Sequence, residues 1–169
     1  DEDGVPDNQK IVDAMIQVNA TLVVAKDSED KRAHHRPWPN SQGVYTEEIF
    51  PLGQNERYDG ALEEVLHLIT DYGWENAYPS AFGRKRGTDA AKASELARGG
   101  NFEDVPEKYP DKAWHTYYDE TCHYKCQIGE YLHWAFTSIL GGQDYPGTFE
   151  RGKDQWDLRT KEQVRLGDP

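Results

Sequence analysis

The stretch DETCHYKCQIGEYLHWAFTSIL, residues 119–140, decides the predicted fold because it has the length and the apolar spacing of a long helix. Asp119 can cap this helix, and the glycine pair at 141–142 can end it. A second helix is predicted over residues 58–72, YDGALEEVLHLITDY, with Gly73 as its end. In both helices the apolar residues share one face, so each helix is predicted to be amphipathic.

Each of these helices carries a Glu-x-x-His motif on its polar face. The first motif contains Glu64 and His67, and the second contains Glu130 and His133. This spacing places a carboxylate and an imidazole one turn apart on one side of a helix. His123 falls on the same face of the second helix. The two motifs together indicate a metal site between the helices, and the alternative is that both polar faces are simply solvated.

The rest of the chain predicts shorter elements around these two helices. A helix is expected from Asp7 to about Val18, and another after the capping residue Thr88. Strands are expected at residues 21–25 and 44–50, and a short helix at 160–166. We therefore predict an α+β fold: one mostly helical domain over residues 1–169, with a small two-stranded or larger antiparallel sheet and an extended C-terminal tail over residues 143–169.

The composition restricts the classes of partner. The formal net charge is −12 and the pI is about 4.9, so the chain repels nucleic acid and anionic membrane surfaces. No apolar run approaches the roughly 18 residues of a membrane-spanning helix. Calcium, other cations and basic partners are electrostatically favoured. The many Trp and Tyr residues could also line a face for a peptide or glycan ligand.

The two cysteines and one sequon bear on the compartment. At the spacing of Cys122 and Cys126, Cβ atoms on a regular helix lie roughly 5–6 Å apart, whereas a disulfide needs about 3.8 Å. A disulfide therefore requires Cys122 to lie in a non-ideal first turn, and free thiols or metal ligation are the alternatives. Asn19 begins the triplet Asn-Ala-Thr, a candidate glycosylation site. These features favour a secreted, extracellular protein.

The N-terminal run DEDGVPD, residues 1–7, is rich in carboxylates and has a glycine at its turn. It resembles the calcium loops of thrombospondin type 3 repeats and EF-hand-like bacterial motifs. The resemblance implies calcium bound by the carboxylates of Asp1, Asp3 and Asp7 and by the carbonyl of Val5. The alternative is an acidic helix cap with a solvated turn.

The run Glu63-Glu64-Val65-Leu66-His67 resembles the zincin HExxH helix, with Glu63 in place of the first histidine. The resemblance implies that His67 and Glu63 bind zinc and that Glu64 is the general base that activates water. A third ligand would come from the second helix: His123, Glu130 or His133.

These expectations lead to three hypotheses of function. The first is a zinc-dependent hydrolase, a peptidase or its inactive relative, that also binds calcium. The second is a non-catalytic extracellular structural protein that associates with itself. The third is a di-iron carboxylate protein, because ferritin-like sites also use two Glu-x-x-His motifs; iron is accordingly the less favoured metal.

Overall fold

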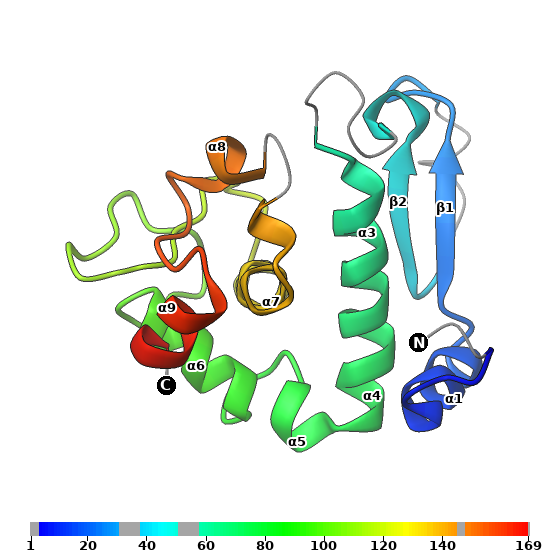
Figure 1. Ribbon diagram of the computed structural model, residues 1–169, viewed down its shortest axis with the longest axis horizontal. Coiled ribbons are helices and arrows are strands. Elements are labelled where there is room, and N and C mark those ends of the chain that lie inside the picture. The colour runs from blue at the N-terminus through cyan, green and yellow to red at the C-terminus, as the bar shows by residue number, and fades with distance from the viewer. Residues whose placement is uncertain (1–3, 31–37, 51–57, 145–147, 169) are drawn as a thin grey trace.

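Helices dominate the chain, and the longest of them runs through its centre (Figure 1). The computed structural model describes residues 4–30, 38–50, 58–144 and 148–168. The prediction of a mostly helical α+β domain with a small sheet is confirmed. In chain order the elements are α1 (Gln9–Gln17), β1 (Thr21–Ala25), β2 (Ser41–Tyr45), η1 (Thr46–Glu48), α3 (Gly60–Leu68), η2 (Ile69–Trp74), α4 (Glu75–Ala77), α5 (Pro79–Phe82), α6 (Asp89–Ala97), α7 (Tyr124–Leu140), η3 (Gly142–Asp144), α8 (Thr148–Gly152) and α9 (Lys161–Gly167).

Helix α7 is buried on nearly all sides, and the main core forms around it. Its predicted apolar residues Ile128, Leu132 and Ala135 are buried, in a cluster with residues of α6 and α9. In Figure 1, α7 is seen end-on between α3 on one side and α6 with α9 on the other. Because helices cover both sides of α7, its polar face is also removed from water, which places polar residues inside the protein.

The two strands pair in parallel, so the prediction of an antiparallel sheet is wrong. Thr21 lies opposite Ser41, and Ala25 lies opposite Tyr45. A parallel pair needs a crossover of about a dozen residues or more, and the connection over residues 26–40 is long enough. The second strand also lies earlier than the predicted 44–50, because residues 46–48 turn into the 3-10 helix η1.

Helix α3, η2 and α4 form one continuous rod rather than a helix that ends at Gly73. Asp59 caps the rod by accepting a hydrogen bond from the backbone N–H of Ala61, at 3.0 Å. The middle section, η2, is a wider π-helical turn. Gly73 lies where α1 packs against the rod: a Cβ atom there would lie 2.6 Å from Cγ2 of Ile11. The glycine thus permits close helix packing instead of ending the helix.

Of two further predicted helix starts, the one at Thr88 is confirmed and the one at Asp119 is wrong. Thr88 caps α6 as predicted, since its hydroxyl accepts from the N–H of Ala91. Helix α7, however, begins at Tyr124 and not after Asp119. The Asp119 carboxylate instead accepts hydrogen bonds from the N–H and hydroxyl of Thr121, in a separate local turn. A side-chain cap satisfies local donors without deciding whether the helix continues from that point.

The C-terminal segment predicted as an extended tail carries η3, α8 and α9. Trp156 and Val164 from this segment are buried in the core around α7. The predicted short helix is present as α9, and Thr160 and Gln163 form its capping box. The C-terminal segment thus packs against α7, and Arg151 of α8 contacts Glu63 of α3.

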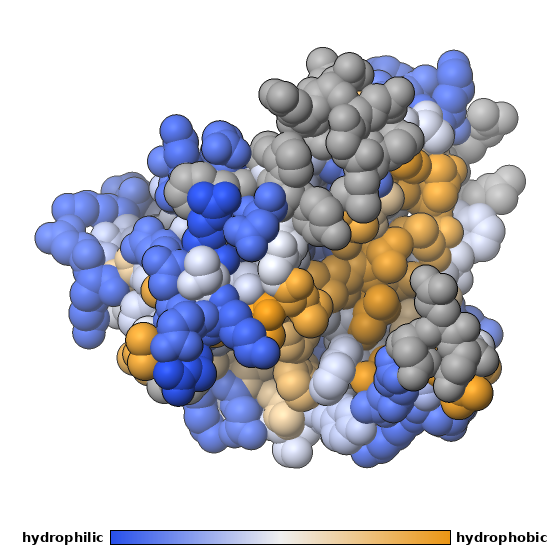
Figure 2. All heavy atoms as spheres, in the orientation of Figure 1, coloured by the Kyte–Doolittle hydropathy of each residue, from blue (hydrophilic) through white to orange (hydrophobic). Residues whose placement is uncertain are grey.

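An apolar surface lies over the outer side of α3. Leu62 and Val65 are 43% and 38% exposed, and Val24 of β1 is 54% exposed. Figure 2 shows apolar atoms over this side of the molecule, where α3 and the sheet meet. In the part of the chain that the structure describes, no helix combines the length and the apolar character needed to cross a membrane.

Candidate metal centre

Three side chains from α3 and α7 converge on one point. They are Glu63 and His67 of α3 and His133 of α7, and one ligand atom from each lies within 4.8 Å of the other two. His67 and His133 are buried, and the side chain of Glu63 is only 16% exposed. Two histidines and a carboxylate that meet in a buried place form the donor set of a transition-metal site.

The orientation of α3 about its own axis points these side chains toward the interior of the protein. The sequence pattern predicts Leu62 and Val65 on the apolar, core-facing stripe. In the structure, these two residues are partly exposed, and His67 and Leu68 are buried. The helix turns its polar side toward α7, so the Glu and His side chains face one another across the two helices.

The two histidines are neutral imidazoles in this environment. Burial is the main cause that lowers the pKa of His67 to about 4 and that of His133 to about 3. Their rings stack with centroids 5.4 Å apart. Nδ1 of His133 is buried and has no hydrogen-bond partner among the described residues. A neutral, buried imidazole with a free nitrogen is the form that binds a metal ion.

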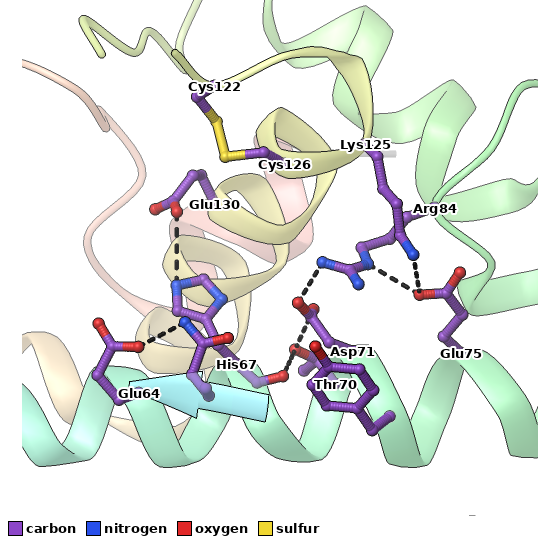
Figure 3. Close-up of polar contacts among 12 residues, drawn as sticks. Glu64, His67, Thr70, Asp71, Glu75, Arg84, Cys122, Lys125, Cys126 and Glu130 are labelled. Atoms are coloured by element: carbon purple, nitrogen blue, oxygen red, sulfur yellow. Dashed lines mark hydrogen bonds and ion pairs between the residues drawn. A yellow bond between two sulfur atoms is a disulfide. The ribbon is translucent and has the colours of Figure 1, made fainter. Parts of the chain in front are cut away.

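Glu130 lies at the edge of this group. Its Oε1 is 3.6 Å from Nε2 of His67 (Figure 3). Burial, followed by the charge of Glu63, raises the pKa of Glu130 to about 8, although a hydrogen bond with Tyr117 lowers it. A carboxyl group with such a pKa exchanges protons near neutral pH, so it can act as an acid or a base beside a bound metal.

Glu64, the predicted general base, is not one of the three converging residues. Its Oε2 accepts a hydrogen bond of 2.5 Å from Nε2 of Gln42 in β2. Burial is the largest cause that raises its pKa to about 7, and the negative charges of Glu63 and Glu48 raise it further. Glu64 therefore lies next to the candidate centre but on the side of the sheet.

Arg151 of α8 covers the outer side of Glu63. Its Nη1 lies 2.6 Å from Oε2 of Glu63, and its guanidinium group lies 4.5 Å from the centre of the Tyr58 ring. The ion pair fixes one carboxylate oxygen, which leaves the other oxygen of Glu63 for a metal ion. A basic partner behind a ligand carboxylate is a typical orienting contact of metal sites.

A second ionic network holds the rod against α7 one turn further along. The Arg84 guanidinium pairs with Asp71 and, at 2.9 Å, with Glu75, and Lys125 lies 3.5 Å from the same Glu75 oxygen (Figure 3). Gly129 of α7 makes room for this network, since a Cβ atom there would lie 3.3 Å from Nη1 of Arg84. The network fixes the two helices close to His67 and Glu130.

The dimensions of the group suit a small divalent ion. Two ligand atoms of a tetrahedral zinc ion lie about 3.4 Å apart, because each bond is about 2.0–2.2 Å long. The ligand atoms, now up to 4.8 Å apart, therefore draw together by up to about 1.4 Å when such an ion binds. Three protein ligands leave a fourth coordination position open, as in catalytic rather than structural zinc sites.

His123, another predicted ligand, does not join this group. It is the residue before α7, and its exposed ring lies 2.6 Å from Oδ1 of Asp104. The neighbouring cysteines Cys122 and Cys126 form a disulfide with a Cα–Cα distance of 5.3 Å. Because α7 begins at Tyr124, Cys122 lies outside the regular helix, as the disulfide prediction required.

The predicted calcium loop lies partly outside the described residues. Asp1 and Asp3 fall in the undescribed residues 1–3. Gly4 has a positive φ of 79°, as a sharp turn there requires, and Val5 and Asp7 follow it. Asn19 of the sequon is exposed, with its carbonyl accepting a hydrogen bond from the Thr21 hydroxyl. Calcium binding and glycosylation thus remain predictions.

The sequence reasoning missed several residues around the centre. Tyr58, Tyr117 and Arg151 come from outside the two motif helices, and Gln42 comes from β2. None has a spacing that connects it with the Glu-x-x-His motifs, so only the folded chain brings them together. Comparison of the chain with protein-family models, curated proteins and solved structures found no match.

Proposed function

We propose that the chain is a zinc-dependent hydrolase of the peptidase type, with zinc held by Glu63, His67 and His133. The observation that carries this proposal is the convergence of these three side chains in a buried place between α3 and α7. Two histidines and one glutamate form the ligand set of well-known catalytic zinc peptidases, in which one position stays open for water or substrate.

The surrounding residues support hydrolysis. A zinc ion in this place would supply Lewis-acid polarisation and lower the pKa of water. Glu130, at 3.6 Å from His67, is placed to accept and return a proton on the α7 side of the centre. Glu64 is the corresponding carboxyl group on the sheet side, where Gln42 orients it. The Arg151 ion pair keeps Glu63 in position.

A closed structural site is the second candidate, and Glu130 is the observation that favours it. Its carboxylate lies near enough to His67 to join the centre as a fourth ligand with a small movement. Four protein ligands would leave no open position, and the ion would then only hold α3 and α7 together. Such a site would suit a non-catalytic extracellular protein. The same residue types also suit ferrous iron, so the metal must be identified by analysis.

Secretion and calcium binding belong to the same proposal. The disulfide between Cys122 and Cys126 fits an oxidising compartment. The exposed sequon at Asn19 and the acidic run at the N-terminus fit it as well. In this reading calcium orders the N-terminal loop ahead of α1, at a distance in the sequence from the zinc ligands, and the two metals have separate roles.

The first experiment measures the metal content of the purified protein by elemental mass spectrometry. We compare the wild type with the His67→Ala/His133→Ala double variant, and use the exposed His123→Ala as the matched control. We expect one equivalent of zinc in the wild type and in the control, and loss of zinc in the double variant. Calcium bound at the N-terminus should be unchanged in all three proteins.

The second experiment tests activity on the zinc-loaded protein with a mixture of quenched fluorescent peptides. The hydrolase proposal predicts cleavage that a chelator abolishes and added zinc restores, and that Glu130→Gln lowers by at least about a hundredfold. Zinc that binds in one equivalent, without cleavage of any peptide or ester, would establish the structural site instead. Absence of a transition metal in the wild type would refute both candidates.

A further inference from the structure

A depression of about 400 Å³ opens beside the candidate metal centre. It shares Glu63 with the centre and extends from there toward η1 and the start of α3. Gly60 allows this arrangement, because a Cβ atom in its place would lie 3.1 Å from Cβ of Glu48. The described residues that line the depression are Glu47, Glu48, Phe50, Tyr58, Gly60, Glu63, Glu64 and Arg151.

The described lining is strongly acidic. It contains four glutamates and one basic residue, Arg151. The charge of Arg151 is already engaged, because its guanidinium pairs with Glu63 and lies over the Tyr58 ring. Glu47, Glu48 and Glu64 lie in the same lining, in which Arg151 is the one basic residue among those the structure describes. The depression is thus complementary to a positive charge.

A separate observation indicates that the candidate metal centre beside the depression receives a ligand. His133 is buried and its Nδ1 has no hydrogen-bond partner among the described residues, yet it belongs to the same three-residue group as Glu63. An orphaned buried nitrogen costs free energy unless something binds to it. The acidic depression therefore adjoins a place that would bind a ligand, because Glu63 lines the depression and also belongs to the candidate metal group.

We propose that the depression binds a positively charged group of the substrate, a protonated amine or a guanidinium, while the adjoining part of the substrate lies at the metal. This inference rests on the proposed hydrolase function and specifies its substrate class as cationic peptides. Glu47 and Glu48 are the specificity-determining residues. They lie at the exposed rim, where they can contact a cation without taking part in the chemistry.

Two sources of the positive charge must be distinguished. A lysine or arginine side chain within the peptide would make the protein select an internal residue. A free amino terminus would make it select the end of a chain. Both present the same chemistry to the carboxylates, so the probes are peptides that differ in only one of these groups.

The experiment is calorimetric titration of zinc-loaded protein with four eight-residue peptides. Three have an acetylated N-terminus and carry lysine, norleucine or glutamate at one central position, and the fourth is the norleucine peptide with a free N-terminus. Norleucine keeps most of the lysine side-chain length without its charge. Mass spectrometry after each titration checks for cleavage, and for any cleaved peptide the ratio of kcat/KM values replaces the ratio of Kd values.

The variant is Glu47→Gln/Glu48→Gln, which keeps side-chain size and the oxygens that accept backbone hydrogen bonds from Ser28 and Tyr45. Glu120→Gln, an exposed residue outside the depression, is the matched control. We expect a cationic peptide to bind about tenfold more tightly than its neutral counterpart, as two partly exposed charge pairs would give. The preference should fall below threefold in the double variant and persist in the control.

The outcomes separate the two proposals. Preference for the lysine peptide assigns a basic side chain, and preference for the free N-terminus assigns a terminal amine. Equal binding of all four peptides, tightest binding of the glutamate peptide, or no binding at all overturns the inference. None of these results decides the hydrolase proposal, which is tested separately by zinc content and by cleavage that a chelator abolishes. Loss of zinc content refutes the hydrolase independently of any peptide preference.

Discussion

Replacement of His115 by phenylalanine should make the protein less sensitive to acid. His115 is fully buried between the rings of Tyr131 and Trp156, and both its ring nitrogens lack hydrogen-bond partners among the described residues. Burial, followed by the nearby charge of Arg98, lowers its pKa to about 3. The unfolded chain binds a proton at this histidine near pH 6.5, whereas the folded protein does not.

The sign and the size follow from this difference in pKa. Because the folded pKa is depressed, the stabilisation is fully present above pH 6.5 and is lost as the pH falls toward 3. Between pH 6 and pH 4 the loss from this single group is about 2–3 kcal/mol in the free energy of unfolding. His115→Phe removes that part of the pH dependence, although the larger ring can lower stability by a constant amount.

The assay is urea unfolding of metal-free wild type and His115→Phe at pH 7, 6, 5 and 4, followed by tryptophan fluorescence. The quantity compared is the slope of the free energy of unfolding against pH, in which a constant packing cost cancels. We expect the slope of the variant to be shallower by about 1.4 kcal/mol per pH unit near pH 5. Equal slopes would show that His115 accepts a proton in the folded protein, and would refute the reasoning.

Two further predictions concern packing and the disulfide. Gly152→Ala should lower the free energy of unfolding by about 1–3 kcal/mol, because the added Cβ would overlap the rigid ring of Trp134; denaturant unfolding measures this, and an unchanged midpoint would contradict it. Replacement of Cys122 and Cys126 together by serine should cost about 2 kcal/mol through the greater freedom of the unfolded chain. Thermal unfolding with and without a reductant checks that value, since a reductant should destabilise the wild type and leave the serine variant unaffected.

Local signals predicted much of the secondary structure. The strand at Thr21–Ala25, the cap at Thr88 and the capping box at Thr160 all depend on residues a few positions apart, and all are present. The parallel pairing of the strands depends on a distant crossover, and no spacing within either strand reveals it. The sequence predicts a helix end at Gly73, whereas the structure uses this glycine for a contact with Ile11 of α1, a residue far away in the sequence.

The candidate site was predictable to the same extent. The resemblance to the zincin helix predicts Glu63 and His67 as ligands, and His133 is one of the three alternatives predicted for the third; the structure brings these three residues together. The direction in which α3 turns was not predictable, since its exposed Leu62 and Val65 look like core residues in the sequence. Arg151 reaches Glu63 only because α8 folds back over the start of α3.

The π-helical turn at Ile69–Trp74 changes the direction in which side chains point from one part of the rod to the next. In a regular α-helix, side chains along the whole length follow one constant rotation of about 100° per residue. The directions in which residues near the two ends point are then fixed relative to each other. The wider turn rotates the second half relative to the first. Residues of α3 can therefore be selected for the metal, and residues of the turn and of α4 for packing against α1, while Asp71 and Glu75 also hold the rod to α7 through the ionic network.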